Sequence, residues 1–217
     1  SDQRGSEDIT GSVLSAVADV MLDRPEDALK ELSKPQVGNQ QDAPIWRAIA
    51  LARQGRWGEA QDIFKKVSAA MGALPIELQR MAMKEALRSS IEVRDFNNAT
   101  RLVNDFETVG VTPDLEPTIN VLLGRLYEGL GRTEDALASY RAAAMSNDRR
   151  SAAQGRLRET VLAFATGAMG RKDVINDIET LTTVWRGDET ETEGLKLLAH
   201  LYTEDSRYRD AFHVMRT

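Results

Sequence analysis

The stretch that decides the fold is Pro117–Asp148, which reads PTINVLLGRLYEGLGRTEDALASYRAAAMSND. It predicts a helix, a tight turn at Gly131 and a second helix that starts near Thr133. Small residues at Gly124 and Ala136 would let the two helix backbones approach closely. The stretch therefore predicts an antiparallel helical hairpin.

The signature of this hairpin consists of small and aromatic residues at helical spacing. One face of the first helix carries Leu123, Gly124 and Tyr127, and one face of the second carries Ala136, Tyr140 and Ala143. Together with Gly131, these positions make the stretch resemble a tetratricopeptide repeat (TPR). The final proline of that signature is replaced by Asp148. This difference affects only the expected turn after the second helix.

The same register recurs along the whole chain. The second-helix anchors of the successive copies are Ala28, Ala60, Ala99, Ala136, Val174 and Ala211, spaced by 32, 39, 37, 38 and 37 residues. These spacings lie near the 34-residue tetratricopeptide period. We therefore expect an all-α, right-handed α-solenoid of about six antiparallel helical hairpins, forming one TPR-like domain over residues 1–217.

The expected helix pairs follow from the anchors and from the turn signals between them. They are 9–22 with 25–34, 43–54 with 57–70, 75–93 with 96–109, 117–130 with 133–146, 151–168 with 171–185, and 190–204 with 207–217. No linker divides this series, so the repeats are expected to stack as a single array.

Composition excludes several classes of protein. Of the 217 residues, 41% are hydrophobic and 29% are charged, and no apolar run is long enough to span a membrane. The net charge of −6 is spread evenly over both halves of the chain, so we expect no nucleic-acid partner. The absence of cysteine removes disulfides, thiol catalysis and cysteine-ligated metals.

The two ends of the sequence lead to an expectation about the full-length protein. The chain begins with Ser1 in a polar segment without a signal peptide, so we expect a fragment of a longer protein. An Arg-rich composition indicates a bacterial source. The sequence is compatible with a location in the cytoplasm and with one in the periplasm. The last helix carries Ala211, Phe212 and Met215 without a polar capping element, so we expect further helices beyond Thr217. In the isolated chain, this uncapped hairpin would allow self-association.

No motif for catalysis or for cofactor binding is present. Phosphate-binding loops, dinucleotide fingerprints and nucleophile elbows are all missing from the sequence. His200 and Glu204 lie one helical turn apart, but a zinc site needs at least three protein ligands. We therefore expect no catalytic residue, no cofactor, no metal site and no enzymatic activity.

The resemblance implies a binding face. In tetratricopeptide arrays the first helix of each pair lines a concave groove, and the positions here that match include Ile45, Ile49, Lys84, Arg88 and Arg125. The middle of this groove would be cationic and its beginning apolar, which suits a peptide with an acidic and an apolar part. Alternatively, the apolar positions pack under another segment and bind nothing.

These observations predict a protein–protein interaction scaffold or adaptor that binds a peptide or a partner protein on its concave face. The alternative is a non-catalytic accessory module of a larger multidomain enzyme or of an envelope-associated protein.

Overall fold

The computed structural model describes residues 2–216, with side chains from Thr10 onward. Within that range every regular element is a helix. In chain order the helices are α1 (Asp2–Met21), α2 (Pro25–Leu32), α3 (Pro35–Gly38), α4 (Ala43–Arg53), α5 (Trp57–Lys66), α6 (Ser68–Gly72), α7 (Ile76–Glu92), α8 (Phe96–Val109), α9 (Glu116–Gly129), α10 (Thr133–Ala144), α11 (Arg149–Ala165), α12 (Arg171–Val184), α13 (Glu189–Glu204) and α14 (Tyr208–Met215). The all-α helical-repeat fold predicted from the sequence is confirmed.

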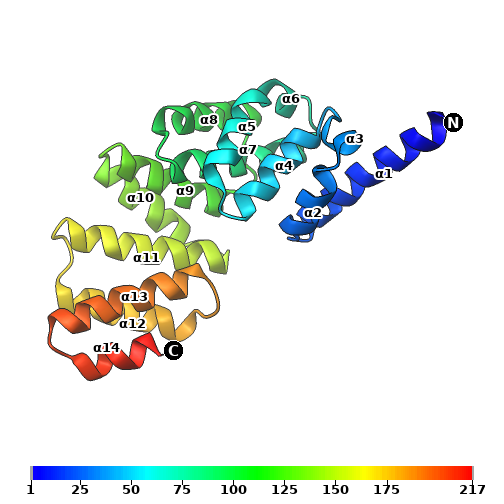
Figure 1. Cartoon of the computed structure of the whole chain (residues 1–217). Helices are drawn as coiled ribbons and strands as arrows, with labels where there is room; N and C mark the ends of the chain where they lie inside the picture. Colours follow the sequence, from blue (N-terminus) through cyan, green and yellow to red (C-terminus); the bar gives the residue numbers. More distant parts are fainter. Residues whose placement is uncertain (1, 217) are drawn as a thin grey trace. The chain divides into compact units, whose positions relative to one another are not determined.

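The chain divides into two compact units, Ser1–Val111 and Thr112–Thr217. The first unit contains the hairpins α1–α2, α4–α5 and α7–α8, and the second contains α9–α10, α11–α12 and α13–α14 (Figure 1). Within each unit, every hairpin packs against the next one along the chain. The single domain expected over residues 1–217 stays a prediction.

The six second-helix anchors lie in the cores of these hairpins. Ala28, Ala60, Ala99, Ala136, Val174 and Ala211 are each no more than 2% exposed. A small side chain at this position lets the second helix approach the first closely, and the burial removes that side chain from water. The repeat register inferred from the sequence is therefore the register of the structure.

The turns within the hairpins share one backbone conformation. Each contains a residue with φ between 57 and 76°, and these residues are Asp23, Gly55, Arg94, Gly131, Gly167 and Ser206. In five of the hairpins, the N–H of the following residue donates to the carbonyl five positions back, at 2.7–2.9 Å. This pattern satisfies carbonyl groups that the end of the first helix would leave without partners.

Two short helices were not predicted. α3 follows the first hairpin, and α6 follows α5 after a break at Val67. The sequence had indicated one continuous helix over 57–70, because Ser68–Gly72 contains no proline and no strong helix stop. The chain therefore forms two short helices, α5 and α6, in place of the expected single one.

Gly124 of α9 lies directly against Tyr140 of α10. A Cβ atom built on Gly124 would lie 2.3 Å from Cε1 of Tyr140, so the ring occupies the space that a side chain on Gly124 would need. The close approach expected at Gly124 and Ala136 thus includes the ring of Tyr140. Ala136 is fully buried, but the large partner of the glycine is the tyrosine one turn further along α10.

Tyr127 has a different role from Tyr140. The guanidinium of Arg132, just beyond the turn, lies 4.7 Å from the centre of the Tyr127 ring. The same arrangement recurs in the last hairpin, where Arg207 lies 4.4 Å from the ring of Tyr202. These cation–π contacts join the end of the first helix to the start of the second.

Candidate functional site

The two apolar residues expected in the groove lie in the core. Ile45 and Ile49 on α4 are 0% and 1% exposed. Their helix packs against α1, α2, α5 and α7, which all belong to the first unit. Side chains without accessible surface cannot contact a partner unless the core opens, so Ile45 and Ile49 are core residues and not part of a binding face.

The two cationic residues on α7 retain accessible surface. Lys84 and Arg88 lie one helical turn apart and are both partly exposed. The guanidinium of Arg88 lies 4.9 Å from the centre of the Trp57 ring, at the start of α5. The Nζ atom of Lys84 lies 3.4 Å from an Oε1 atom of the neighbouring Glu85. α7 therefore presents two positive charges beside an aromatic side chain.

Glu85 is the buried centre of this group. Its side chain is 6% exposed and lies between α4 and α7, where Arg53 Nε approaches its Oε1 to 3.7 Å. Arg53 also donates to the carbonyl of Val20 and reaches Asp23. A buried carboxylate needs such partners, because an unpaired charge in the core would be strongly destabilising. Arg53 thus links the first two hairpins to α7 and is itself mostly covered.

Two further arginines on first helices, Arg80 and Arg125, differ in their surroundings. Arg80 donates to the carbonyls of Val109 and Gly110, at 3.1 and 3.0 Å, and so satisfies the C-terminal end of α8. This structural role accounts for its low exposure. Arg125 lies on α9 in the second unit and is partly exposed. Lys84 and Arg88 therefore lie close together on α7, whereas Arg125 belongs to the other unit.

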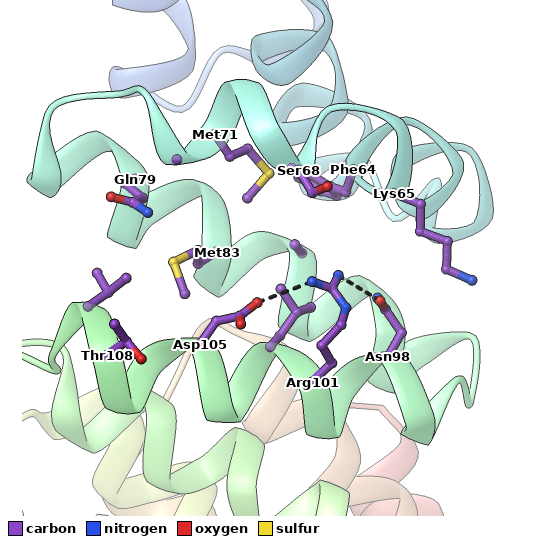
Figure 2. Close-up of a pocket in the computed structure, with 14 residues that line it drawn as sticks. Phe64, Lys65, Ser68, Met71, Gln79, Met83, Asn98, Arg101, Asp105 and Thr108 are labelled. Atoms are coloured by element: carbon purple, nitrogen blue, oxygen red, sulfur yellow. Dashed lines mark hydrogen bonds and ion pairs between the residues drawn. The ribbon is translucent and has the colours of Figure 1, made fainter.

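A cavity of about 230 Å³ lies in the first unit, bounded by α5, α6, α7 and α8. Its apolar lining includes Phe64, Met71, Met83 and Leu102, which are all buried residues of the core. Figure 2 shows Met71 and Met83 among the side chains that line it. The cavity lies beside the break between α5 and α6, and no sequence signal indicated that break.

Polar side chains surround the mouth of this cavity. Arg101 donates to Asn98 at 2.9 Å and pairs with Asp105 at 3.2 Å, as Figure 2 shows. Asn98 donates from its side chain to Ser90 at 2.7 Å, and Asp95 caps the start of α8. The rim is therefore held by a continuous hydrogen-bonded network along one face of α8.

Asp95 also joins two hairpins. Its Oδ2 atom accepts from Lys65 Nζ at 2.6 Å and from Gln61 Nε2 at 2.8 Å, and its Oδ1 accepts from the backbone N–H of Asn98. The hydrogen bond from Lys65, followed by that from Asn98, holds the pKa of the Asp95 carboxyl below its usual range. The charged form is thus the one that the fold stabilises.

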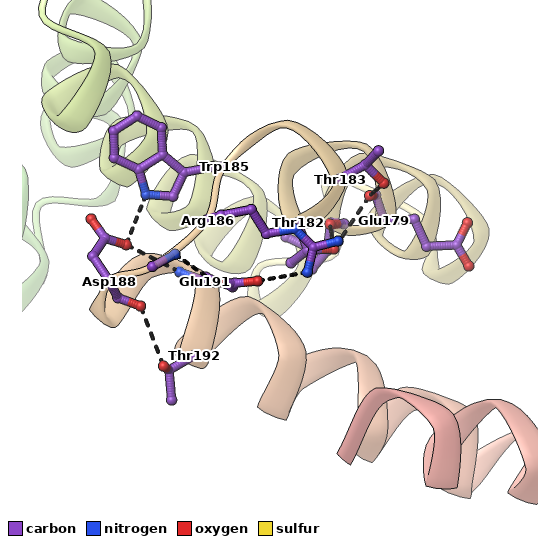
Figure 3. Close-up of polar contacts among 10 residues, drawn as sticks. Glu179, Thr182, Thr183, Trp185, Arg186, Asp188, Glu191 and Thr192 are labelled. Carbon is purple, nitrogen blue, oxygen red and sulfur yellow. Dashed lines mark hydrogen bonds and ion pairs between the residues drawn. The ribbon is translucent and has the colours of Figure 1, made fainter. Parts of the chain in front are cut away.

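In the second unit, the acidic run before α13 serves as a helix start. Asp188 accepts from the backbone N–H groups of Thr190 and Glu191, and from the indole Nε1 of Trp185 at 2.7 Å (Figure 3). Glu191 pairs with Arg186 at 2.8 Å and accepts from the N–H of Gly187. These carboxylates suit the positive end of the helix dipole, and a calcium loop is not needed to explain them.

The basic residues of α11 meet acidic residues of the helices that follow. Arg150 approaches Asp188, Arg156 pairs with Asp177 at 3.0 Å, and Arg158 approaches Glu193. The pair Arg156–Asp177 joins the two helices of one hairpin, whereas Arg150 and Arg158 reach the start of the next hairpin, and each of these exposed pairs contributes little to stability. Within the described part of the chain, no three ligating side chains gather as a metal site would require. Among residues 2–216, no helix is both long and apolar enough for a membrane span.

Comparison with known families supports the repeat at Pro117–Asp148. Residues 121–153 match the family model described as tetratricopeptide repeat. The match covers most of α9, all of α10 and the beginning of α11, and it includes Gly124, Tyr127, Ala136 and Tyr140. No curated protein matches the chain. The resemblance to tetratricopeptide repeat proteins is confirmed, and such repeats are typical of non-catalytic modules for protein–protein interaction.

Proposed function

We propose that this protein is an interaction scaffold that binds an acidic segment of a partner protein at Lys84 and Arg88. The observation that carries the proposal is the position of Arg88. Its guanidinium lies over the ring of Trp57, and Arg88 itself lies one helical turn from Lys84 on α7. A tetratricopeptide-like module with two neighbouring cations on a first helix suits a carboxylate-bearing peptide.

The stacking of Arg88 on Trp57 supports this proposal. A guanidinium held over an aromatic face keeps its donor groups in a fixed plane, which suits the two oxygens of a carboxylate. Because part of the conformational freedom of the side chain is already lost, a partner carboxylate would have less ordering cost to overcome. Trp57 is partly exposed and could contact an apolar residue next to the partner's acidic group.

The charges around Glu85 support it as well. Arg53 and Lys84 both lie within 4 Å of the Glu85 carboxylate. Glu85 is buried, whereas Lys84 and Arg88 reach solvent. Lys84 and Arg88 are thus two cations with accessible surface on one helix of a chain whose net charge is −6. Long-range steering would favour acidic segments at this place over the rest of the surface.

The test is a binding titration with peptides of matched length. One peptide carries several Glu residues next to a Leu or Phe, and a second replaces each Glu with Gln. We expect the acidic peptide to bind more tightly and to lose affinity as salt rises from 50 to 500 mM, because exposed charges are screened. Trp fluorescence and titration calorimetry both report the binding.

Charge-removing variants locate the site. Lys84→Gln and Arg88→Gln should each weaken binding of the acidic peptide about fivefold, as expected for loss of one partly exposed ion pair. Lys66→Gln removes one positive charge from an exposed position of the same unit and serves as the control. Equal effects of all three variants would show a non-specific charge effect and would contradict the site. Arg125→Gln tests separately whether the second unit has a cationic contact of its own.

A further inference from the structure

The cavity of the first unit has the size of a single aromatic side chain. Its volume is about 230 Å³. An apolar cavity of about 150 Å³ is large enough to bind benzene, whereas pockets for cofactors and other larger ligands usually measure about 300–1,000 Å³. A ring of the size of benzene or indole therefore fits this cavity, and a typical cofactor does not.

The apolar lining of the cavity favours an aromatic ring over an aliphatic group. Phe64 of α5, Met71 of α6 and Met83 of α7 all contribute to it, and each is at most 4% exposed. The thioether of methionine makes favourable contacts with aromatic rings, and its flexible side chain adapts to the shape of a guest. Phe64 adds an aromatic partner for a second ring. An aliphatic group would be buried equally well but would gain neither contact.

The rim of the cavity offers hydrogen bonds and balanced charges. Arg101 pairs with Asp105 at 3.2 Å, and Lys65 pairs with Asp95 at 2.6 Å. Gln79 adds a side-chain amide, which both donates and accepts. Peptide groups likewise donate and accept without carrying charge. The rim therefore suits the uncharged backbone on either side of a bound ring better than it suits a charged ligand.

The polar rim is longer than one ring. Asn98, Arg101 and Asp105 follow one another along α8, and all three retain accessible surface (Figure 2). Seven residues of a helix rise by about 10 Å, which is also the span of roughly three residues of an extended chain. This α8 row therefore matches a short stretch of polypeptide and not a free aromatic molecule.

We propose that the cavity binds one aromatic side chain of a partner protein, while the partner's backbone on either side of that residue lies along the α8 row. The ring enters between α5, α6, α7 and α8 and contacts Met71 and Met83. The hydrogen-bonding groups of Asn98, Arg101 and Asp105 meet the neighbouring peptide groups.

This site is separate from the surface at Lys84 and Arg88. α7 contributes Gln79, Met83 and Ala86 to the cavity lining, and Lys84 and Arg88 are not part of it. A helix turns by about 100° per residue, so Lys84 and Arg88 lie on roughly the opposite side of α7 from those three residues. The first unit can therefore hold an aromatic residue and an acidic segment at the same time.

The test uses an uncharged, end-blocked peptide with one Phe between Ser and Gly residues, and a matched peptide with Ala in place of Phe. Burial of the ring should make the Phe peptide bind at least about tenfold more tightly. NMR spectra of a chain labelled with ¹³C at its methionine methyl groups report where it binds, because the ring current of a bound Phe should shift the Met71 and Met83 resonances. Met145, which is 86% exposed and belongs to the other unit, should not shift.

Gly72 provides a variant that closes the cavity without crowding the core. It lies in the lining at the end of α6, and a Cβ built on it would meet nothing within 4 Å. Gly72→Leu should therefore fold and should weaken binding of the Phe peptide at least about tenfold, since its side chain takes the place of the ring. Gly58→Leu is the matched control. Gly58 is another helical glycine of the first unit with open space at its Cβ, but it lies outside the lining, so this variant should bind as wild type does.

Several results would overturn the proposal. Methyl resonances of Met71 and Met83 that stay unchanged at millimolar Phe peptide, or that shift equally with the Ala peptide, would show that no ring enters. A Gly72→Leu chain that binds as wild type does would place the ring elsewhere. If toluene binds as tightly as the Phe peptide, the cavity takes free aromatic molecules and the partner segment is wrong. Both peptides are uncharged, so Lys84→Gln should leave their binding unchanged, and failure here leaves the proposed function unaffected.

Discussion

The ring of Tyr140 lies directly against the backbone of Gly124, and its hydroxyl donates to Glu128 Oε2 at 2.7 Å. The tyrosine thus contacts α9 at two successive turns, once through its ring and once through its hydroxyl. Burial, together with the hydrogen bond to Glu128, raises the pKa of the Tyr140 hydroxyl well above its ordinary value. Tyr140 therefore stays neutral and sets the distance between the two helices of the fourth hairpin.

Gly124→Ala should destabilise the protein, although alanine is the better helix former. The new methyl group would lie 2.3 Å from the ring of Tyr140, which is fully buried and has no open space to enter. We expect a loss of about 1–3 kcal/mol in the free energy of unfolding, measured by urea denaturation. Gly58→Ala, at an open helical position, should instead be neutral or slightly stabilising. A stable Gly124→Ala variant would show that α9 and α10 can separate at little cost.

Gly155→Ala should be at least as harmful as Gly124→Ala. Its Cβ would lie 2.6 Å from the carbonyl oxygen of Tyr140 and 2.8 Å from the backbone nitrogen of Ala144. Backbone atoms within a helix cannot turn aside as a side chain can, so α11 would have to shift away from α10. Denaturant unfolding followed by circular dichroism should show a loss of about 2–3 kcal/mol. An effect clearly smaller than that of Gly124→Ala would contradict the close approach of these two helices.

Asp95 provides a prediction about pH. Asp95→Asn keeps an oxygen that can cap α8 but loses the charge that pairs with Lys65, whereas Asp95→Ala loses both. At pH 7 we expect Asp95→Ala to lose about 1 kcal/mol or more, and Asp95→Asn to lose less.

The lowered pKa of Asp95 determines how this difference varies with pH. A carboxyl whose pKa is lower in the folded state contributes stability that is fully present above its unfolded value, and this stability is lost as the pH falls through the folded value. The stability difference between wild type and Asp95→Asn should therefore be constant near neutral pH and decrease below pH 3.8, the ordinary value for this group. A difference that stays constant to pH 2 would contradict the assigned interaction.

Asp188 should matter for both the start of α13 and the position of Trp185. Replacing it with Ala removes the acceptor for two backbone N–H groups and for the indole N–H (Figure 3). We expect a loss of about 1–2 kcal/mol in stability and a shift of the Trp185 indole resonance in NMR spectra. Asp188→Asn keeps the acceptor oxygen and should lose less. An unchanged indole resonance in the Ala variant would show that the hydrogen bond is absent in solution.

The sequence was sufficient to predict the repeat and its register. Anchors such as Ala60 and Ala211 recur at a nearly constant spacing because every hairpin needs a small buried side chain where its helices meet. This requirement is local, so it leaves a periodic pattern that one sequence reveals. The turns are less visible, since Asp23, Arg94 and Ser206 adopt the left-handed conformation in place of glycine.

Contacts between side chains were harder to predict than the register. Ile45 and Ile49 match groove positions of the family, yet neighbouring helices cover them completely. The cavity beside Met71 depends on a break at Val67 that no proline or glycine marks. Such features result from packing between elements, which helical periodicity does not encode.

The neighbour-only packing within each unit also affects how the chain folds. Helices there contact the other helix of their own hairpin or the hairpins next to it, so native contacts join residues close together in sequence. Low contact order of this kind favours rapid folding, because little loop-closure entropy has to be overcome before contacts form. During synthesis on the ribosome, each hairpin can begin to fold as soon as its second helix has left the exit tunnel, and the preceding hairpin then serves as its template.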